Sequence, residues 1–217
     1  MSIGRLSRIL LNMENLTKAS LTALKESKYV KPLTLSFEQN GTQRTWDFLE
    51  VHDSVAIIIY NVSNSKLVFV KQFRPPVYVM SIPASERTDN IDVKKYPAHL
   101  GFTLELCAGI VDKKLSLAEI ASEEILEECG YKVHHNQLER VSSYRSGVGT
   151  TGSEQTLYYC EVTDEMKENK GGGVEDEIID VIEMSVPEIR EFMKKEHILS
   201  PPSFLYAMQW FLANKQV

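Results

Sequence analysis

One predicted helix constrains this chain more than any other feature of its sequence. Ser116 stands three residues before Glu119, the spacing of a capping box, in which each side chain satisfies a free backbone N–H at the helix start. Gly130 is suited to end the helix, because glycine adopts the left-handed conformation at low cost. These signals predict a helix over 117–129, with apolar residues spaced to form one face that packs on a core.

Three glutamates interrupt the apolar face of this helix. At 100° per residue, Glu124 and Glu128 fall in the middle of the apolar arc and Glu127 falls at its edge. Like charges three and four residues apart repel one another, and burying unpaired carboxylates costs far more. A solvated acidic face is the alternative, but the position within the apolar arc favours a compensating cation. Carboxylate oxygens suit a hard divalent ion, so we expect Mg²⁺, with Mn²⁺ as the alternative.

The spacing of these glutamates resembles the Nudix box, G-x5-E-x7-R-E-U-x-E-E-x-G-U, where U is aliphatic. Two positions depart from the pattern, since Leu115 replaces the first Glu and Glu123 replaces the Arg. In the family these two form a supporting pair, so we expect both replacements to be structural. The resemblance implies that the three glutamates hold metal, that the backbone carbonyl of Ala108 completes the metal shell, and that Glu127 also belongs to the catalytic group. The matching positions are Gly109, Glu124, Ile125, Glu127, Glu128, Gly130 and Tyr131.

Further strings resemble the UDP-sugar pyrophosphatase branch of this family. That resemblance implies hydrolysis of a nucleoside diphosphate sugar, with UDP-glucose giving UMP and glucose 1-phosphate. An ADP-ribose pyrophosphatase is the alternative enzyme, and a non-catalytic Nudix module that binds nucleotide sugars is the alternative from another class. The strings are HDSV at 52–55, KQFRP at 71–75, ELCAGIVD at 105–112, EECGY at 127–131 and SGVGTTGS at 146–153.

Five residues are candidates for binding the substrate. Arg74 follows a predicted buried strand, and a guanidinium suits phosphate, although a surface salt bridge is the alternative. The resemblance implies that Glu105 lies near the site. Trp46 either packs within its hairpin or stacks on a nucleobase. Gly149 and Ser153 belong to a loop of small residues, which allows backbone N–H groups to approach phosphate or sugar.

The general base is expected outside the box, because metal occupies the box glutamates. Glu175 and Glu177 directly follow the glycines at 171–173, which we expect to be a mobile connector. Such a hinge would allow the loop to close over substrate and bring a carboxylate to the attacking water. A solvated acidic turn is the alternative. Of the two glutamates we favour Glu175, because it lies further into the loop.

The predicted fold is an α/β/α sandwich of the Nudix type with a mixed sheet, plus an N-terminal β-hairpin. The chain divides into an N-terminal extension at 1–29, a hairpin region at 30–52 and a Nudix hydrolase domain at 53–217. Residues 75–102 show little periodicity, which indicates a functional insertion or partial disorder. Strands are expected at 31–39, 42–51, 55–60, 66–72, 102–107, 138–144, 156–162 and 178–184, and helices at 187–195 and 203–213.

Composition excludes several functional classes. A net charge of −6 provides no electrostatic footprint for nucleic acid, and no apolar run is long enough to span a membrane. Three cysteines without metal-type spacing predict reduced thiols and a cytoplasmic location. Residues 1–13 form either an amphipathic helix or a transit peptide. The resemblance further implies a homodimer that packs through the N-terminal β region.

Overall fold

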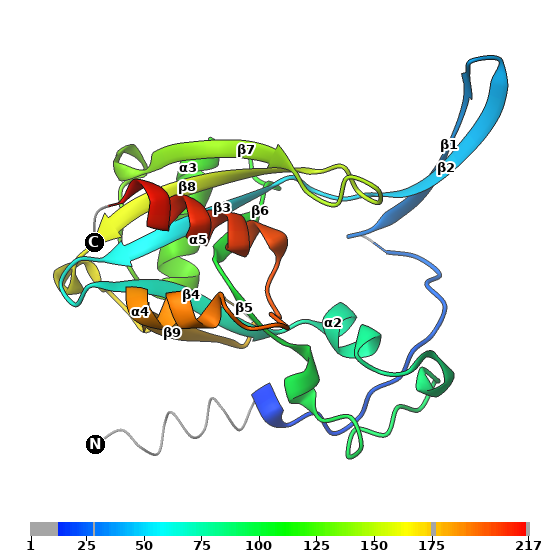
Figure 1. The fold of residues 1–217 in the computed structure, drawn as a ribbon, viewed down its shortest axis with the longest axis horizontal. Coiled ribbons are helices and arrows are strands. Elements are labelled where there is room, and N and C mark those ends of the chain that lie inside the picture. Colours follow the sequence, from blue (N-terminus) through cyan, green and yellow to red (C-terminus); the bar gives the residue numbers. More distant parts are fainter. Residues whose placement is uncertain (1–12, 28, 175–176, 216–217) are drawn as a thin grey trace.

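A mixed sheet forms the centre of the computed structural model, which describes residues 13–27, 29–174 and 177–215 (Figure 1). Strand β3 runs parallel to β8, and the other neighbouring strands are antiparallel. The strand order is β5-β4-β3-β8-β7, with β6 also paired to β3 and β9 to β4. The sheet strands are β3 (Ser54–Asn61), β4 (Lys66–Phe73), β5 (Phe102–Glu105), β6 (Cys107–Ile110), β7 (Glu139–Arg145), β8 (Glu154–Val162) and β9 (Ile179–Ser185).

Helices cover both faces of this sheet (Figure 1). Alternate residues of β3 belong to two separate core clusters, one packed against α3 (Leu117–Glu124) and the other against α4 (Val186–Phe192) and α5 (Pro202–Asn214). The predicted α/β/α sandwich and the burial of β3 on two faces are therefore confirmed. The first cluster contains Val55, Ile57 and Ile59 of β3, and the second contains Ala56, Ile58 and Tyr60.

The single strand predicted at 102–107 is wrong, because the chain changes partner at Leu106. Before this residue β5 pairs with β4, and after it β6 pairs with β3. Direct pairing between β3 and β4 is limited to the stretch that starts at Ile59 and ends at Lys66. Strands β3 and β4 diverge beyond that stretch, and the chain crosses from one to the other. This divergence opens the sheet at the end where the candidate site lies.

The predicted N-terminal hairpin is present and projects away from the sheet (Figure 1). Strands β1 (Lys31–Gln39) and β2 (Thr42–Glu50) pair along their whole length, and Asn40 and Gly41 form the turn with positive φ angles. One face carries Leu35 opposite Trp46, and these residues are 54% and 57% exposed. This leaves an uncovered apolar face on the hairpin.

The insertion at 75–102 is ordered, contrary to the alternative of partial disorder. It contains α2 (Pro75–Met80) and the 3₁₀ turns η1 (Ala84–Glu86) and η2 (Ala98–Gly101). The buried Tyr78 donates a hydrogen bond to the Tyr96 carbonyl at 2.7 Å, and Ile91 forms a β-bridge with Ala19. Apolar residues without regular spacing thus pack a small lobe together with the preceding N-terminal segment.

Other elements lie close to their predicted positions. Strands β7, β8 and β9 and helices α4 and α5 each begin and end within three residues of the predicted bounds. Short 3₁₀ turns, η4 (His135–Gln137) and η5 (Asp164–Met166), precede β7 and follow β8. No helix in the described ranges is long and apolar enough to reach across a bilayer. The amphipathic segment predicted at 1–13 lies, except for its last residue, outside the described residues.

Candidate active site

The box helix begins and ends where the sequence predicts, but its last turn is wider than an α-helical turn. Ser116 and Glu119 form the capping box, and Gly130 ends the helix with φ +79°. Between them α3 gives way at residue 125 to a π-helical turn, η3 (Ile125–Cys129), which carries two of the three box glutamates. Such π turns occur frequently at functional sites.

Glu128 is the most buried of the box glutamates, with 5% of its surface exposed. One of its carboxylate oxygens accepts a hydrogen bond from the backbone N–H of Ala108 at 2.9 Å. Burial, with a contribution from the charges of Glu124 and Glu177, raises the pKa of Glu128 to about 8, although the hydrogen bond from the Ala108 N–H lowers it in part. The carboxylate therefore sits where its negative charge is poorly compensated by the described residues.

Glu124 lies beside β6 and is half-buried. A Cβ atom added at Gly109 would collide with the Glu124 side chain, so only glycine permits this close approach. Burial, together with the neighbouring charge of Glu127, raises the pKa of Glu124 to about 7, and Lys113 offsets part of this rise. Two box carboxylates thus share a site in which ionisation is unfavourable.

The carboxylate and carbonyl oxygens of this site are suitable ligands for a divalent cation, although the carboxylates do not surround a common point in this structure. Among the described residues, no three His, Cys, Asp or Glu side chains meet closely enough to enclose a metal ion. However, Glu124, Glu128 and Glu177 line one cavity, in which the charge of Glu177 raises the pKa of both Glu124 and Glu128, and Ala108 also lines this cavity. Mutual repulsion of this kind is what a bound cation relieves.

Arg74 and Glu105 form a two-bond ion pair across β4 and β5. Arg74 Nε lies 2.8 Å from Glu105 Oε1, and Nη2 lies 2.7 Å from Oε2. Thr103 donates a further hydrogen bond to Glu105 at 2.6 Å, and Gln72 donates another at 3.4 Å. Burial opposes ionisation of Glu105, but these partners together hold its pKa below the usual value. The Arg74 side chain remains 46% exposed and lines the cavity described next, so a ligand in that cavity can contact it.

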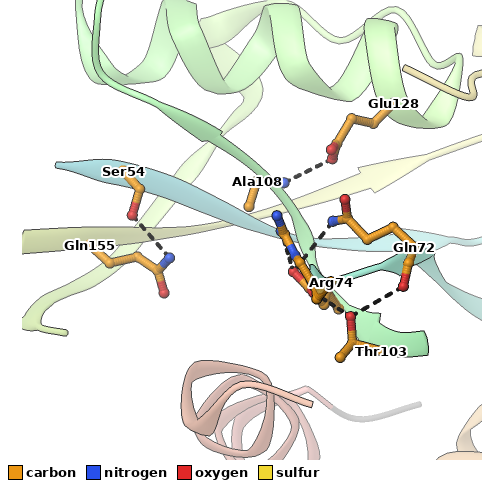
Figure 2. Close-up of polar contacts among 8 residues, drawn as sticks. Ser54, Gln72, Arg74, Thr103, Ala108, Glu128 and Gln155 are labelled. Carbon is orange, nitrogen blue, oxygen red and sulfur yellow. Dashed lines mark hydrogen bonds and ion pairs between the residues drawn. The ribbon is translucent and has the colours of Figure 1, made fainter. Parts of the chain in front are cut away.

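A cavity of about 790 Å³ joins these groups. Figure 2 shows Arg74, Gln72 and Thr103 together, the Ala108–Glu128 contact beside them, and Ser54 with Gln155 at the opposite side. Six of the predicted site residues line this cavity, namely Arg74, Glu105, Ala108, Glu124, Glu128 and Glu177. Glu127 is half-buried on η3 but does not line the cavity.

The other predicted substrate residues lie apart from the cavity lining in this chain. The indole N–H of Trp46 donates a hydrogen bond to the Gly149 carbonyl at 3.0 Å, which joins the hairpin to the loop between β7 and β8. Ser153 belongs to the same loop, and Ser146 at its start does line the cavity. Hairpin and loop are therefore in contact at the margin of the site.

The glycines at 171–173 are docked on the end of the box helix and do not form a free connector. Gly172 N–H donates to the Glu128 carbonyl at 2.9 Å, and Gly173 N–H donates to the Glu127 carbonyl at 3.1 Å. All three glycines have positive φ, and a Cβ at Gly171 would collide with the Glu128 carbonyl. Orphan carbonyls at the helix end thus receive their donors from this segment. Glu177 follows it, whereas Glu175 lies outside the described residues.

Comparison with known proteins places the chain in a family. It is 40% identical over 213 residues to the uridine diphosphate glucose pyrophosphatase NUDT14 of Bos taurus, and the match covers 93% of this chain and 96% of that protein. The chain belongs to the Nudix hydrolase family. The Mus musculus protein of the same name is 40% identical over 214 residues, with the same shares of each chain. The GDP-mannose pyrophosphatase of Cronobacter sakazakii is 32% identical over 149 residues, which are 67% of this chain and 68% of that protein.

A solved structure shares the Nudix fold with this chain. The crystal structure of an ADP compounds hydrolase matches with a TM-score of 0.61 over 93% of this chain and 95% of that one, at 14% identity. No protein-family model matches the chain. The Nudix resemblance, and within it the UDP-glucose pyrophosphatase branch, are confirmed by the relatives above.

Several cavity residues of this Nudix hydrolase were not among the predicted site residues. Ser54 and Gln155 line the cavity from β3 and β8. Gln72 and Thr103 also line it and donate hydrogen bonds to the Glu105 carboxylate. The HDSV string at 52–55 was the one sequence signal that included Ser54. The segment 198–201 before α5 also lines the cavity, and nothing in its composition distinguishes it from an ordinary loop.

Proposed function

We propose that this protein hydrolyses the pyrophosphate bond of a nucleoside diphosphate sugar, with UDP-glucose as the substrate and UMP and glucose 1-phosphate as the products. The observation that carries the proposal is one cavity in which carboxylates of the box helix face the Arg74–Glu105 pair. The relatives named as UDP-glucose pyrophosphatases support the choice of substrate. A cavity of about 790 Å³ is within the range of sites for ligands of this size.

Mg²⁺, or Mn²⁺ in its place, would be held by Glu124, Glu127 and Glu128 with the Ala108 carbonyl. When bound, such a cation polarises the phosphoryl oxygens and lowers the pKa of bound water. Ala108 serves the site twice, because its N–H already holds the Glu128 carboxylate and so orients it. The glycine at position 109 allows the Glu124 side chain to lie against β6.

Arg74 would bind the pyrophosphate through the accessible part of its guanidinium. Glu105 occupies two of the guanidinium donors and fixes the plane of the group, which leaves the remaining N–H donors for phosphate oxygens. An acidic residue of the loop before β9 would take the proton from the attacking water. Glu175 is our first choice, because Glu177 already accepts a hydrogen bond from Val174 N–H at 3.0 Å.

We further propose that the nucleobase stacks on Trp46 at the margin of the site, with Gly149 and Ser153 of the adjoining loop close to the substrate. The Trp46–Gly149 hydrogen bond supports this arrangement. We also propose a homodimer that packs through the exposed apolar face of the hairpin, and a cytoplasmic location, for which three buried free cysteines are the supporting observation.

Turnover of the purified protein tests the proposal. UDP-glucose, ADP-ribose and a dinucleoside polyphosphate are compared with and without Mg²⁺, and we expect UDP-glucose to be preferred. Glu124→Gln and Glu128→Gln should each lower kcat at least about a hundredfold, the scale of losing a key electrostatic group. Glu123→Gln on the same helix is the matched control and should retain activity. Binding of UDP-glucose without turnover at any metal concentration would identify a non-catalytic module instead.

A further inference from the structure

The side of the cavity away from Arg74 carries a pair of neutral hydrogen-bonding side chains that the pyrophosphate chemistry does not use. Ser54 stands at the start of β3, and Gln155 is its neighbour in the parallel register of β8. Gln155 Nε2 donates to Ser54 Oγ at 3.1 Å (Figure 2). Both residues line the cavity and both are half-buried.

The orientation of the Gln155 amide is set by a second partner. Tyr144, on the neighbouring strand β7, pairs with Gln155, and its hydroxyl donates a hydrogen bond to Gln155 Oε1 at 2.9 Å. Burial raises the pKa of Tyr144 to about 12, so this hydroxyl keeps its proton at neutral pH. The amide oxygen is therefore directed to Tyr144 and the amide nitrogen to Ser54.

A count of hydrogen-bond donors shows what this pair offers to a ligand. The amide nitrogen of Gln155 has two N–H donors, of which Ser54 takes one, and Ser54 Oγ accepts that bond, so its own O–H is free to donate. Ser200, on the facing segment, also lines the cavity, and its Oγ is the one buried side-chain polar atom without a partner in the described part of the chain. Buried polar groups in proteins are normally hydrogen-bonded, so this hydroxyl too is available to a ligand once it rotates about χ1.

The position of the pair relative to the box is set by strand register. Ala108 pairs with Ala56 and Ile110 pairs with Ser54, so Ser54 lies two residues along the strands from the Ala108–Glu128 contact. Two residues of a strand span about 7 Å. A group attached directly to a pyrophosphate bound beside the box glutamates would therefore reach Ser54 and Gln155. Neither of these side chains carries a charge.

We propose that Ser54 and Gln155 form the subsite for the sugar of the substrate, donating hydrogen bonds to its hydroxyl oxygens and thereby determining specificity. This inference rests on the proposed nucleotide-sugar hydrolysis. Neutral donors at this distance suit a polyhydroxylated ring, since a phosphate would favour cationic partners. In this arrangement the nucleobase lies at Trp46, at the margin of the cavity.

Deoxy analogues of the sugar test the assignment. The kcat and KM of wild type, Gln155→Met and Ser54→Ala are measured with UDP-glucose and with analogues that lack one glucose hydroxyl each. We expect each variant to lose about tenfold in kcat/KM on UDP-glucose, mainly through KM, which is the scale of one hydrogen bond. At least one deoxy analogue should be poorer than UDP-glucose for wild type but equal to it for the variant. Ser142→Ala, which removes a hydroxyl bonded to Tyr206 outside the cavity lining, should behave like wild type.

Two results would overturn the subsite. If every deoxy analogue keeps its full penalty in both variants, the pair holds β3 and β8 together and does not contact the sugar. If instead the preference for UDP-glucose over ADP-glucose disappears, the pair contacts the base. Failure of the proposed function is distinguishable, because wild type would then not turn over UDP-glucose. In that case the binding of glucose 1-phosphate and of UMP is measured by calorimetry. If the subsite is correct, glucose 1-phosphate binds wild type more tightly than Gln155→Met, whereas UMP binds both proteins equally.

Discussion

Lys113 Nζ lies 2.6 Å from a carboxylate oxygen of Glu123, and this ion pair joins the loop after β6 to helix α3. Glu123 occupies the box position where an Arg is usual, and Leu115, at the position of its usual Glu partner, is 41% exposed. We therefore expect this ion pair to replace the supporting pair of the box with reversed polarity, with its cation on the loop and its anion on the helix.

Exchanging these two charges tests that replacement. Lys113→Glu should lower the free energy of unfolding by up to about 1 kcal/mol, because both side chains are more than 40% exposed and solvent screens the pair. Lys113→Glu combined with Glu123→Lys should restore most of the loss. Thermal melting of wild type, Lys113→Glu, Glu123→Lys and the double variant measures the coupling. Glu123→Ala should keep its Mg²⁺ dependence, and loss of metal binding in that variant would make Glu123 a ligand.

Removing the charge of Glu128 should stabilise the metal-free protein at alkaline pH. The pKa of Glu128 is raised from 4.5 to about 8, so its contribution to stability is complete below pH 4.5 and is lost as pH rises to about 8. Glu128→Gln should therefore melt several degrees above wild type at pH 8.5 in chelator, since 1 kcal/mol corresponds to about 2–4 °C in a chain of this size. The difference should vanish near pH 4.5. An equal difference at both pH values would show that ionisation is not its cause.

The substitution Gly171→Ala should destabilise the protein more than Gly41→Ala does. Both glycines have positive φ, so alanine costs about 1–2 kcal/mol of backbone strain at either position. Only at Gly171 does the new Cβ meet the Glu128 carbonyl, whereas nothing lies within 4 Å at Gly41. Gly171→Ala should therefore lower Tm more and should also reduce kcat, because it displaces the acidic loop from the box helix. Equal Tm losses with unchanged kcat would show that the docked segment does not position this loop.

The general base should be identified by two substitutions in the loop before β9. Glu175→Gln should lower kcat strongly while KM and metal affinity stay nearly unchanged, the pattern of an interaction made only in the transition state. Glu177→Gln should have a smaller effect, because its carboxylate is held by Val174 N–H. Should Glu177→Gln alone show the kcat loss, the choice within the loop is wrong. If neither substitution does, the base lies elsewhere.

A charge on the apolar face of the hairpin should dissociate the proposed homodimer. Leu35 lies opposite Trp46 on the exposed apolar face, and Ser36 lies opposite Thr45 on the other face. Leu35→Asp should give a monomer in light scattering coupled to size exclusion, since an unpaired charge in an apolar interface is costly. Ser36→Asp, one residue further on the opposite face, is the matched control and should remain dimeric. A wild-type monomer at micromolar concentration would contradict the proposal.

Local signals in the sequence were sufficient for most elements but not for the arrangement of the site. The capping box at Ser116, the Asn40–Gly41 turn and the continuous apolar strand at β3 each act within a few residues, and each was predicted correctly. The partner change at Leu106 and the π turn at Ile125 depend on how distant strands and carbonyls pair, which leaves no local pattern.

The docked glycines show the same limit more clearly. A run of three glycines predicts mobility, because the residue type permits many conformations. Here the same freedom allows the backbone to approach the Glu127 and Glu128 carbonyls, which a side chain would prevent. Similarly, the Gln155 amide is oriented by Tyr144 from another strand, and this contact follows from sheet register alone.

The change of strand partner at Leu106 ties two properties of the enzyme together. Glu105, which fixes Arg74, and Ala108, which holds Glu128, stand on either side of the crossing at Leu106, where the chain leaves β4 and joins β3. Any shift of this short segment would move both Arg74, the proposed phosphate-binding group, and Glu128, a proposed metal ligand. We therefore expect mutations within 105–108 to change the affinity for the diphosphate and the geometry of the metal site together. Relatives that act on different nucleotide sugars are expected to vary outside this stretch, on walls of the cavity that other strands and loops provide.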